Sequence, residues 1–272
     1  MPLEPRSGKR GRQLPALSLP PPFRQVALRE VGDAFAHATR IAAEEGAGTL
    51  VHVGRFDLVE FALVLEPDEP LRSARRAFYA GLNAMVDALV AFAPPEKFIA
   101  VDWPGAIFVD GGLVGGGRLA WPQGADEEAV APWLVFGGML RAVAMEDDPG
   151  LHPNSAALDQ EGFEEFGADR LVESFARHFM VALDAWQEQG FDAIAKAYLP
   201  RLGAASGMRR AIDKNGDLLI QRLVGAEIDK ENERRSERMS GQGLDHSSER
   251  RSLIAALSET SWFDRETGGP RL

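Results

Sequence analysis

The sequence contains no cysteine among its 272 residues. The protein therefore cannot form a disulfide, a thiolate metal site or a cysteine nucleophile, and it cannot carry an acyl group on a cysteine thiol. Two signature motifs are missing as well. No G-x-x-x-x-G-K-[ST] run is present, so we expect no Walker-type phosphate loop, and no G-x-S-x-G run supports an α/β-hydrolase serine.

Histidine and lysine are scarce. The five histidines are isolated from one another and none forms an i, i+4 pair, so we expect no metal centre. The five lysines are Lys9, Lys97, Lys196, Lys214 and Lys230. Few amines are therefore available for any chemistry that requires one.

Long apolar runs are also absent from the start of the chain. Residues 1–23 carry several arginines and end in prolines, and they contain no run long enough for a signal peptide or a membrane span. We predict that this segment is a disordered basic tail. We also predict a cytoplasmic protein with no membrane partner.

Basic residues are few in the middle of the chain. Residues 31–200 hold 27 Asp and Glu against 11 Lys and Arg, within a chain of net charge −11. Such an acidic domain would repel a phosphate backbone, so we expect no nucleic-acid partner. The hydrophobic content of 45% is enough for a sizeable core.

Hydrophobic periodicity indicates the helices and strands. Apolar residues at three-and-four spacing predict helices at residues 28–45, 72–92, 171–189 and 191–199. Short apolar or β-branched runs predict strands at residues 49–53, 58–65, 98–101, 106–109, 113–121 and 133–135. A hairpin turn is expected at residues 110–112.

The composition changes beyond Pro200. Residues 208–222 predict a β-hairpin around Asn215 and Gly216, and the charged residues 229–251 predict a mobile linker. Residues 253–262 are expected to dock back as a short apolar helix or strap. We therefore predict a main domain over residues 24–201 and a small C-terminal module over residues 202–272.

The order of these elements does not alternate as βαβ units do. It predicts an α+β fold, in which helices pack on one side of a largely antiparallel or mixed sheet. A small β module at the C-terminus completes the predicted architecture.

A glycine-rich stretch at residues 111–117 is the most unusual local feature. Glycines weaken a strand unless something approaches its backbone closely. Two explanations remain open. The approaching group is a ligand, or the glycines serve a bulge or a tight strand crossing that needs positive φ.

Three pieces together predict a pocket for an apolar acid. Arg118 and Arg55 can each bind a carboxylate or phosphate bidentately, although surface salt bridges would explain them equally. The aromatic wall and glycine floor predicted to bind the substrate are Trp103, Pro104, Gly115, Gly116 and Gly117. Ordinary core packing is the alternative for Trp103.

Several of these runs resemble motifs of the catalytic domain shared by biotin protein ligases and lipoate-protein ligases. The run Asp-Trp-Pro-Gly-Ala at residues 102–106 is similar to the family's Lys-Trp-Pro-Asn-Asp, and residues 113–116 are similar to its lysine-bearing strand. Residues 134–139 resemble its Gly-Ile-Asn strand, which adds Gly137 and Gly138 to the substrate-binding residues. The resemblance extends over residues 25–225 and implies a class II synthetase or biotin ligase-like fold.

The resemblance implies an acyl-adenylate-forming activity. Biotin, lipoate or octanoate would be activated with ATP and Mg and transferred to a lysine of a biotinyl or lipoyl carrier domain, with Arg118 and Arg55 as the catalytic residues. The family's two lysines correspond here to Asp102 and to Leu113, or to Gly112 if the strands slip by one residue. A second hypothesis is therefore a catalytically inactive relative that binds the acid or the carrier domain without turnover.

Overall fold

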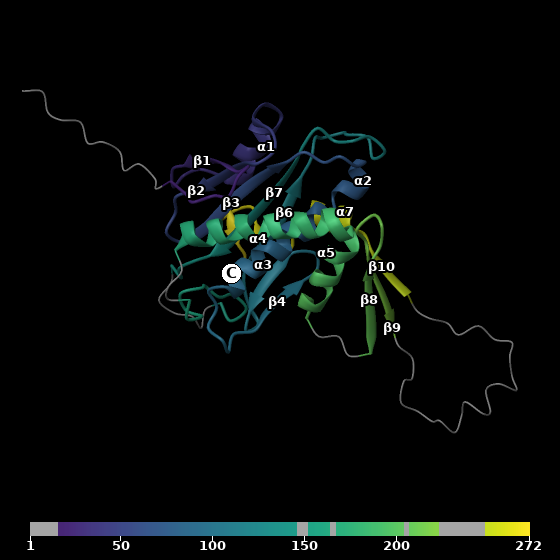
Figure 1. Cartoon of the computed structure of the whole chain (residues 1–272). Helices are drawn as coiled ribbons and strands as arrows, with labels where there is room; N and C mark the ends of the chain where they lie inside the picture. The colour runs from purple at the N-terminus through teal and green to yellow at the C-terminus, as the bar shows by residue number, and fades with distance from the viewer. Residues whose placement is uncertain (1–15, 146–151, 164–166, 204–206, 223–247) are drawn as a thin grey trace, which may run out of the picture.

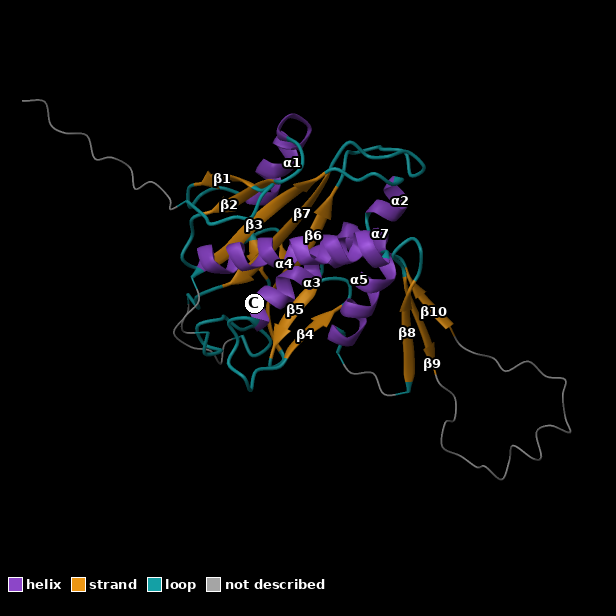
Figure 2. Cartoon of the chain, viewed as in Figure 1, coloured by secondary structure: helices purple, strands orange, loops and turns teal. Residues whose placement is uncertain are grey.

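A seven-stranded sheet forms the centre of the fold, in the order β1-β2-β3-β7-β6-β5-β4 (Figure 1 and Figure 2). The computed structural model describes residues 16–145, 152–163, 167–203, 207–222 and 248–272. β1 runs parallel to β2, and the other neighbouring pairs of this sheet are antiparallel. The strands are β1 (Arg24–Leu28), β2 (Thr49–Val53), β3 (Leu58–Leu65), β4 (Ile99–Asp102), β5 (Ala106–Val109), β6 (Gly112–Ala120) and β7 (Leu134–Arg141).

Three helices cover one face of this sheet and lie in front of the strands in Figure 1. They are α3 (Ala77–Val90), α4 (Ala168–Gln189) and α5 (Phe191–Tyr198), followed by a 3-10 turn at Leu199–Arg201. Phe175 of α4 packs on Phe136 of β7 and on Phe61 of β3, with 5.8 and 4.3 Å between ring centroids. Burial of these large rings holds the helices against the sheet.

The opposite face of the sheet carries α1 (Ala34–Glu45). Successive strand residues point to opposite faces, so Phe61 of β3 joins the main core while Ala62 contacts α1. The predicted α+β class is confirmed. The prediction that helices lie on one side is wrong, because β2 and β3 are apolar on both faces and both faces need cover.

Two predicted helices differ substantially from the structure in their bounds. The helix predicted over residues 28–45 begins at Ala34, because Arg24–Leu28 pairs with β2 and Asp33 caps the helix by accepting a hydrogen bond from Ala36 N at 2.8 Å. The helix predicted over residues 72–92 is divided into α2 (Leu71–Ala74) and α3.

Most of the predicted strands are confirmed. Those predicted at residues 49–53, 58–65 and 106–109 have the same bounds in the structure. The strand predicted over residues 133–135 continues to Arg141, through two glycines that a strand pattern does not favour.

A second sheet of three strands stands beside the first, on the right in Figure 2. It consists of β8 (Met208–Ile212), β9 (Leu218–Arg222) and β10 (Ser248–Arg251), which confirms the predicted hairpin at residues 208–222. Most of the predicted linker, residues 229–247, lies outside the described residues. Its end is not a linker, because residues 248–251 pair antiparallel with β9.

The chain then returns to the large sheet. In α7 (Leu253–Ser258) the side chains of Leu253 and Leu257 are buried, which confirms the predicted docking of residues 253–262. Beyond α7, β11 (Phe263–Asp264) and β12 (Gly269–Pro270) form a short hairpin that packs on β6 and β7. Part of this yellow C-terminal segment is visible behind the sheet in Figure 1, on the face opposite α3 and α4.

The N-terminal end differs in part from its prediction. Residues 1–15 of the predicted disordered tail lie outside the described residues. Leu17, Leu19 and Phe23, however, pack against the main core, so the prediction of disorder is wrong for residues 16–23. No helix in the described part of the chain is long and apolar enough to cross a membrane.

Candidate functional site

The glycine-rich strand β6 contains a bulge. Its pairing with β5 shifts register between Ile107 and Phe108, so that Val114 has no partner across the pair. A side chain at Gly115 would collide with the backbone carbonyl of Met139 on β7. The bulge, one of the two explanations for the glycines, is therefore present at Val114, directly before Gly115.

The glycines predicted to form one floor point to two faces of the sheet. A Cβ at Gly117 would lie 3.1 Å from Phe136, and one at Gly138 would meet Phe61, both on the side of α3 and α4. A Cβ at Gly116 or at Gly137 would instead meet rings that lie on the other face. The predicted floor is thus two separate surfaces, because alternate strand residues face opposite ways.

Trp103 and Pro104 lie on the helical side. The Trp103 Nε1 donates a hydrogen bond to the Tyr79 hydroxyl of α3 at 3.1 Å, and the Tyr198 hydroxyl of α5 donates to the Pro104 carbonyl at 2.7 Å. Trp103 also lines a cavity of about 450 Å³ between β4 and the small sheet. The structure does not bring this aromatic wall together with Arg118, which faces the other way.

Arg118 is buried on the face opposite α3 and α4. Its side chain is 12% exposed, and its Cζ lies 4.3 Å from the centroid of Phe35 and 4.5 Å from that of Phe263. Asp33 Oδ1 lies 3.6 Å from an Nη atom of Arg118. Burial lowers the pKa of Arg118 below its ordinary value, yet an arginine side chain stays charged at any physiological pH.

Glu60 of β3 was not identified from the sequence. It is 3% exposed, and its Oε1 accepts a hydrogen bond from Ala34 N at the start of α1, at 2.7 Å. Burial raises the pKa of Glu60, whereas the charges of Arg118 and Arg55 act to lower it. A single acid inside the otherwise apolar run of residues 58–65 was the available signal.

Arg55 lies in the loop between β2 and β3. It binds Asp57 through two hydrogen bonds, Nε to Oδ1 at 3.0 Å and Nη2 to Oδ2 at 2.6 Å, and these bonds lower the pKa of Asp57. Arg55 lines a cavity of about 210 Å³ together with Leu58, Arg141 and residues of the β11–β12 hairpin. Arg118 does not line that cavity, so the two predicted catalytic arginines are not in one pocket.

The two arginines nevertheless border one continuous surface of the sheet. Across β3, β7 and β6 the register pairs Leu58 with Arg141, Glu60 with Met139, and Met139 with Gly116. We call this surface the arginine face and define it by Leu58, Glu60, Gly116, Arg118, Met139 and Arg141. Met139 and Gly116 make the middle of this face partly apolar, the buried Glu60 lies beside Met139, and Arg118 and Arg141 place cations at its edges. Apolar area next to cations suits an apolar molecule with an anionic group.

The described residues place no lysine on the arginine face. Leu113, at the position of a family lysine by resemblance, belongs to the apolar cluster around Met139. Lys97 is held elsewhere, with its Nζ 2.9 Å from Asp110 and 2.6 Å from Glu161. Any cationic assistance on this face therefore comes from arginine.

Comparisons with known proteins indicate the relatives of this chain. Residues 19–200 match the family described as the biotin/lipoate A/B protein ligase family. A biotin–[acetyl-CoA-carboxylase] ligase of Paracoccus denitrificans is 30% identical over 186 residues, which cover 61% of this chain and 75% of that protein.

Two solved structures are also similar to this chain. A biotin protein ligase-like protein of unknown function from Silicibacter sp. TM1040 is 29% identical with a TM-score of 0.66, over 77% of this chain and 95% of that one. The biotin protein ligase of Aquifex aeolicus in complex with biotin and ATP shares the fold, at 13% identity and a TM-score of 0.54, over 75% of this chain and 97% of that one.

Proposed function

Because this chain belongs to the biotin/lipoate A/B protein ligase family, we propose that it binds an apolar carboxylic acid on the arginine face and activates that acid with ATP. Biotin is the first candidate, since the Paracoccus denitrificans relative is a biotin ligase, and lipoate and octanoate are the alternatives. The acceptor of the acyl group is a lysine of a biotinyl or lipoyl carrier domain. The reaction takes place in the cytoplasm.

One observation carries this proposal. Gly116 has no side chain beside the apolar Met139, and Arg118 follows two residues later on the same face. An apolar chain can lie over Gly116 and Met139 while its carboxylate reaches the guanidinium of Arg118. Arg55, nearer the rim of the face, then binds the phosphates of ATP.

The chemistry proposed is a two-step acyl transfer. A carboxylate oxygen attacks the α-phosphorus of ATP, forming the acyl–phosphate bond as the bond to pyrophosphate breaks. The neutral amine of a carrier lysine then attacks the acyl carbon, forming an amide, releasing AMP and losing a proton. Positive charge placed against the α-phosphate and the carboxylate lowers both barriers, and arginines supply it here.

A second candidate function is binding without turnover. The observation in its favour is the identity of residues 102 and 113, where Asp102 and Leu113 stand at positions of family lysines by resemblance. Removal of one well-placed donor costs about 10²–10³ in rate, so the loss of two cations would abolish adenylation unless the arginines replace them. The binding surface is the same in both cases.

An adenylation assay separates the two functions. The protein is incubated with MgATP and, in turn, biotin, lipoate or octanoate, and pyrophosphate release and acyl-AMP are measured. Product with one acid supports the ligase. If no acid gives product, the ligase is excluded, and calorimetric titration with the same acids and with apo carrier domains tests the binding function. No heat in those titrations would exclude that function too.

We further propose that residues 24–201 are the ligase-like domain and residues 202–272 a C-terminal module. The separate sheet of β8, β9 and β10 supports this division. The two parts are joined where the Tyr79 hydroxyl of α3 donates a hydrogen bond to the Gly216 carbonyl at 2.6 Å. The module also contributes residues to the second cavity, around Trp103. Expression of residues 16–203 alone as a folded, monomeric protein would support the division.

A further inference from the structure

The close approach to the glycine-rich strand is made by the protein's own C-terminal tail, which we define as residues 259–272. Trp262 is 3% exposed, and its Nε1 donates a hydrogen bond to the Gly117 carbonyl at 3.1 Å. The indole lies so near Gly116 that a Cβ there would be 2.6 Å from Nε1. The space left by the missing side chain at position 116 is therefore taken up by Trp262 together with the Gly105 carbonyl, which would lie nearer still to that Cβ.

The tail also covers the cations of the arginine face. Phe263 lies over the guanidinium of Arg118, and Arg141 donates a hydrogen bond to the Pro270 carbonyl at 2.7 Å. The hairpin is closed by a hydrogen bond from Arg271 N to the Trp262 carbonyl at 2.8 Å. A ligand cannot reach Gly116 or Arg118 while these contacts exist.

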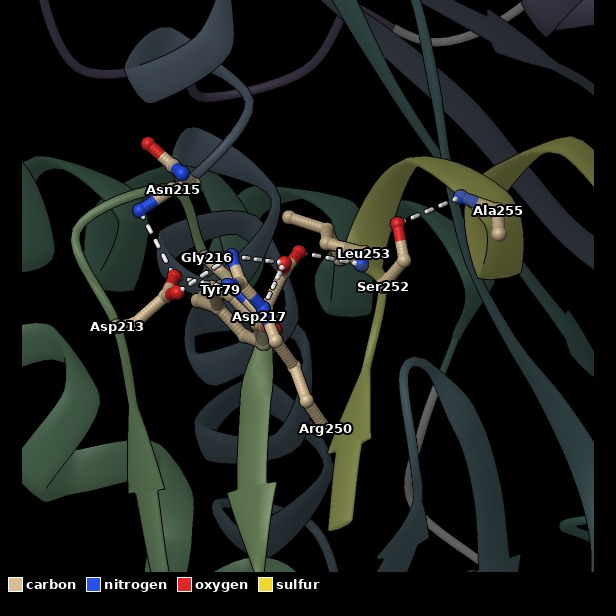
Figure 3. Close-up of polar contacts among 9 residues, drawn as sticks. All are labelled: Tyr79, Asp213, Asn215, Gly216, Asp217, Arg250, Ser252, Leu253 and Ala255. Atoms are coloured by element: carbon tan, nitrogen blue, oxygen red, sulfur yellow. Dashed lines mark hydrogen bonds and ion pairs between the residues drawn. The ribbon is translucent and has the colours of Figure 1, made fainter.

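The tail starts from a firmly anchored point. Figure 3 shows Asp217, in the turn before β9, accepting a hydrogen bond from Leu253 N at 2.9 Å, at the start of α7. Arg250 of β10 pairs with Asp217 at 2.7 Å and with Asp213 at 2.9 Å in the same view. These contacts hold residues 250–253 on their own, so the tail beyond α7 can leave the sheet while the anchor stays.

The tail divides the surface that the ligand would need. On one side of it lies the cavity of about 210 Å³ lined by Arg55 and Leu58, and Gly269 and Pro270 form part of the cavity wall. On the other side lie Gly116 and Arg118, beneath Trp262 and Phe263. Departure of the tail would join the two into one trough along the arginine face.

We propose that the C-terminal tail is an intramolecular plug that occupies the acyl-binding surface and must be displaced before the acid binds. This inference rests on the proposed function for the identity of the ligand. Only the molecules in which the tail is displaced can bind the acid. The apparent affinity is therefore the intrinsic affinity multiplied by the fraction of such molecules. The tail competes with the ligand, and anything that holds the tail away from the sheet activates the protein.

Calorimetry with biotin and with biotinyl-5′-AMP as probes tests the plug. Three forms are compared: the full chain, the chain ending at Ser258, and the full chain with Trp262→Ala and Phe263→Ala. The double variant keeps the test valid if the shortened chain fails to fold. The matched control is Ile254→Ala, because Ile254 lies in α7 and is 41% exposed.

We expect the shortened chain and the double variant to bind at least about tenfold more tightly than the full chain, and the control to bind as the full chain does. Equal or weaker binding by both variants would overturn the plug and leave the proposed function intact. If no form binds either probe, both the plug and the proposed function are wrong.

Limited proteolysis of the full chain gives an independent readout. Arg265 lies at the exposed turn of the β11–β12 hairpin, so trypsin reports on the release of the tail there. A plug predicts faster cleavage after Arg265 when biotinyl-5′-AMP is saturating. Slower cleavage would mean that the tail closes over the bound ligand as a lid, and it would overturn the proposal.

Discussion

The guanidinium of Arg118 is covered by the ring of Phe263, with 4.5 Å between Cζ and the ring centroid. Phe35 covers its other side at 4.3 Å, so the cation lies between two aromatic faces. The guanidinium that we propose binds the carboxylate of the ligand is therefore held in place by the fold, and the tail shields it from water. A carboxylate that replaced Phe263 would meet a desolvated, positioned guanidinium, which binds anions more strongly than an exposed one.

Replacement of Arg118 tests its assignment to the carboxylate. In the chain ending at Ser258, Arg118→Ala is expected to weaken biotin binding about ten- to hundredfold, because one charge-assisted hydrogen-bond partner is lost. Calorimetric titration measures the change. Arg72→Ala is the matched control, since Arg72 forms an exposed ion pair with Glu128 away from this face. Equal affinity in the Arg118 variant would refute the assignment.

A methyl group at position 116 tests how tightly the tail packs. Gly116→Ala is expected to lower the free energy of unfolding of the full chain by about 1–3 kcal/mol, because the new Cβ collides with Trp262 and with the Gly105 carbonyl. Urea unfolding monitored by tryptophan fluorescence measures the loss. Gly203→Ala should be close to neutral, because a Cβ there meets nothing within 4 Å. An unchanged stability in the Gly116 variant would contradict the packing described.

The pH dependence of stability tests the buried state of Glu60. Burial raises the pKa of Glu60 in the fold, so the folded protein binds this proton more tightly than the unfolded chain does. Stability should therefore fall as the pH rises from the unfolded value of 4.5 through the folded pKa. Urea unfolding at several pH values should show this fall in stability in the unmodified protein and not in the Glu60→Gln variant. Parallel curves for the two proteins would rule the effect out.

Asp57 should contribute a pH dependence of stability of the opposite sign to that of Glu60. Its pKa is lowered by the hydrogen bonds from Arg55, so its contribution to stability is present above the unfolded value of 3.8 and lost as the pH falls through the folded pKa. In Asp57→Asn the acid-induced loss of stability should be smaller than in the parent. The same unfolding series measures it, and an unaltered acid limb would contradict the pairing with Arg55.

The contact between the main domain and the C-terminal module is tested at Tyr79. Tyr79→Phe removes the donor to the Gly216 carbonyl and the acceptor of Trp103 Nε1. Because buried partners are left unsatisfied, we expect a loss of about 1–3 kcal/mol in the free energy of unfolding. A double-mutant cycle with Trp103→Phe isolates the bond between the two side chains. A coupling energy of zero would mean that this bond contributes nothing.

Local patterns predicted the strands well and the site only in part. The runs at residues 49–53 and 58–65 are mostly apolar, with Thr49, His52 and Glu60 as the exceptions, and their bounds followed from composition alone. The direction of Gly116 and Arg118 depends on the bulge at Val114, because one extra residue reverses which side chains face the helices. No local pattern reveals such a register shift.

The sequence also does not indicate that the C-terminal tail covers the arginine face. Residues 253–262 were predicted to dock, yet the partner of Trp262 is a glycine carbonyl more than a hundred residues earlier in the chain. Such contacts arise from the whole fold. The sequence predicts that Trp103 shares a pocket with Arg118, because Trp103 is expected opposite the glycine-rich stretch across a short hairpin. Its hydrogen bond to Tyr79 instead holds it on the helical side.

The most direct test of the central claim is a crystal structure of the chain ending at Ser258 grown with biotin. We expect density for biotin over Gly116 and Met139, with its carboxylate within hydrogen-bond distance of Arg118. Biotin bound elsewhere on the protein, or an arginine face that stays empty at saturating biotin, would contradict the account.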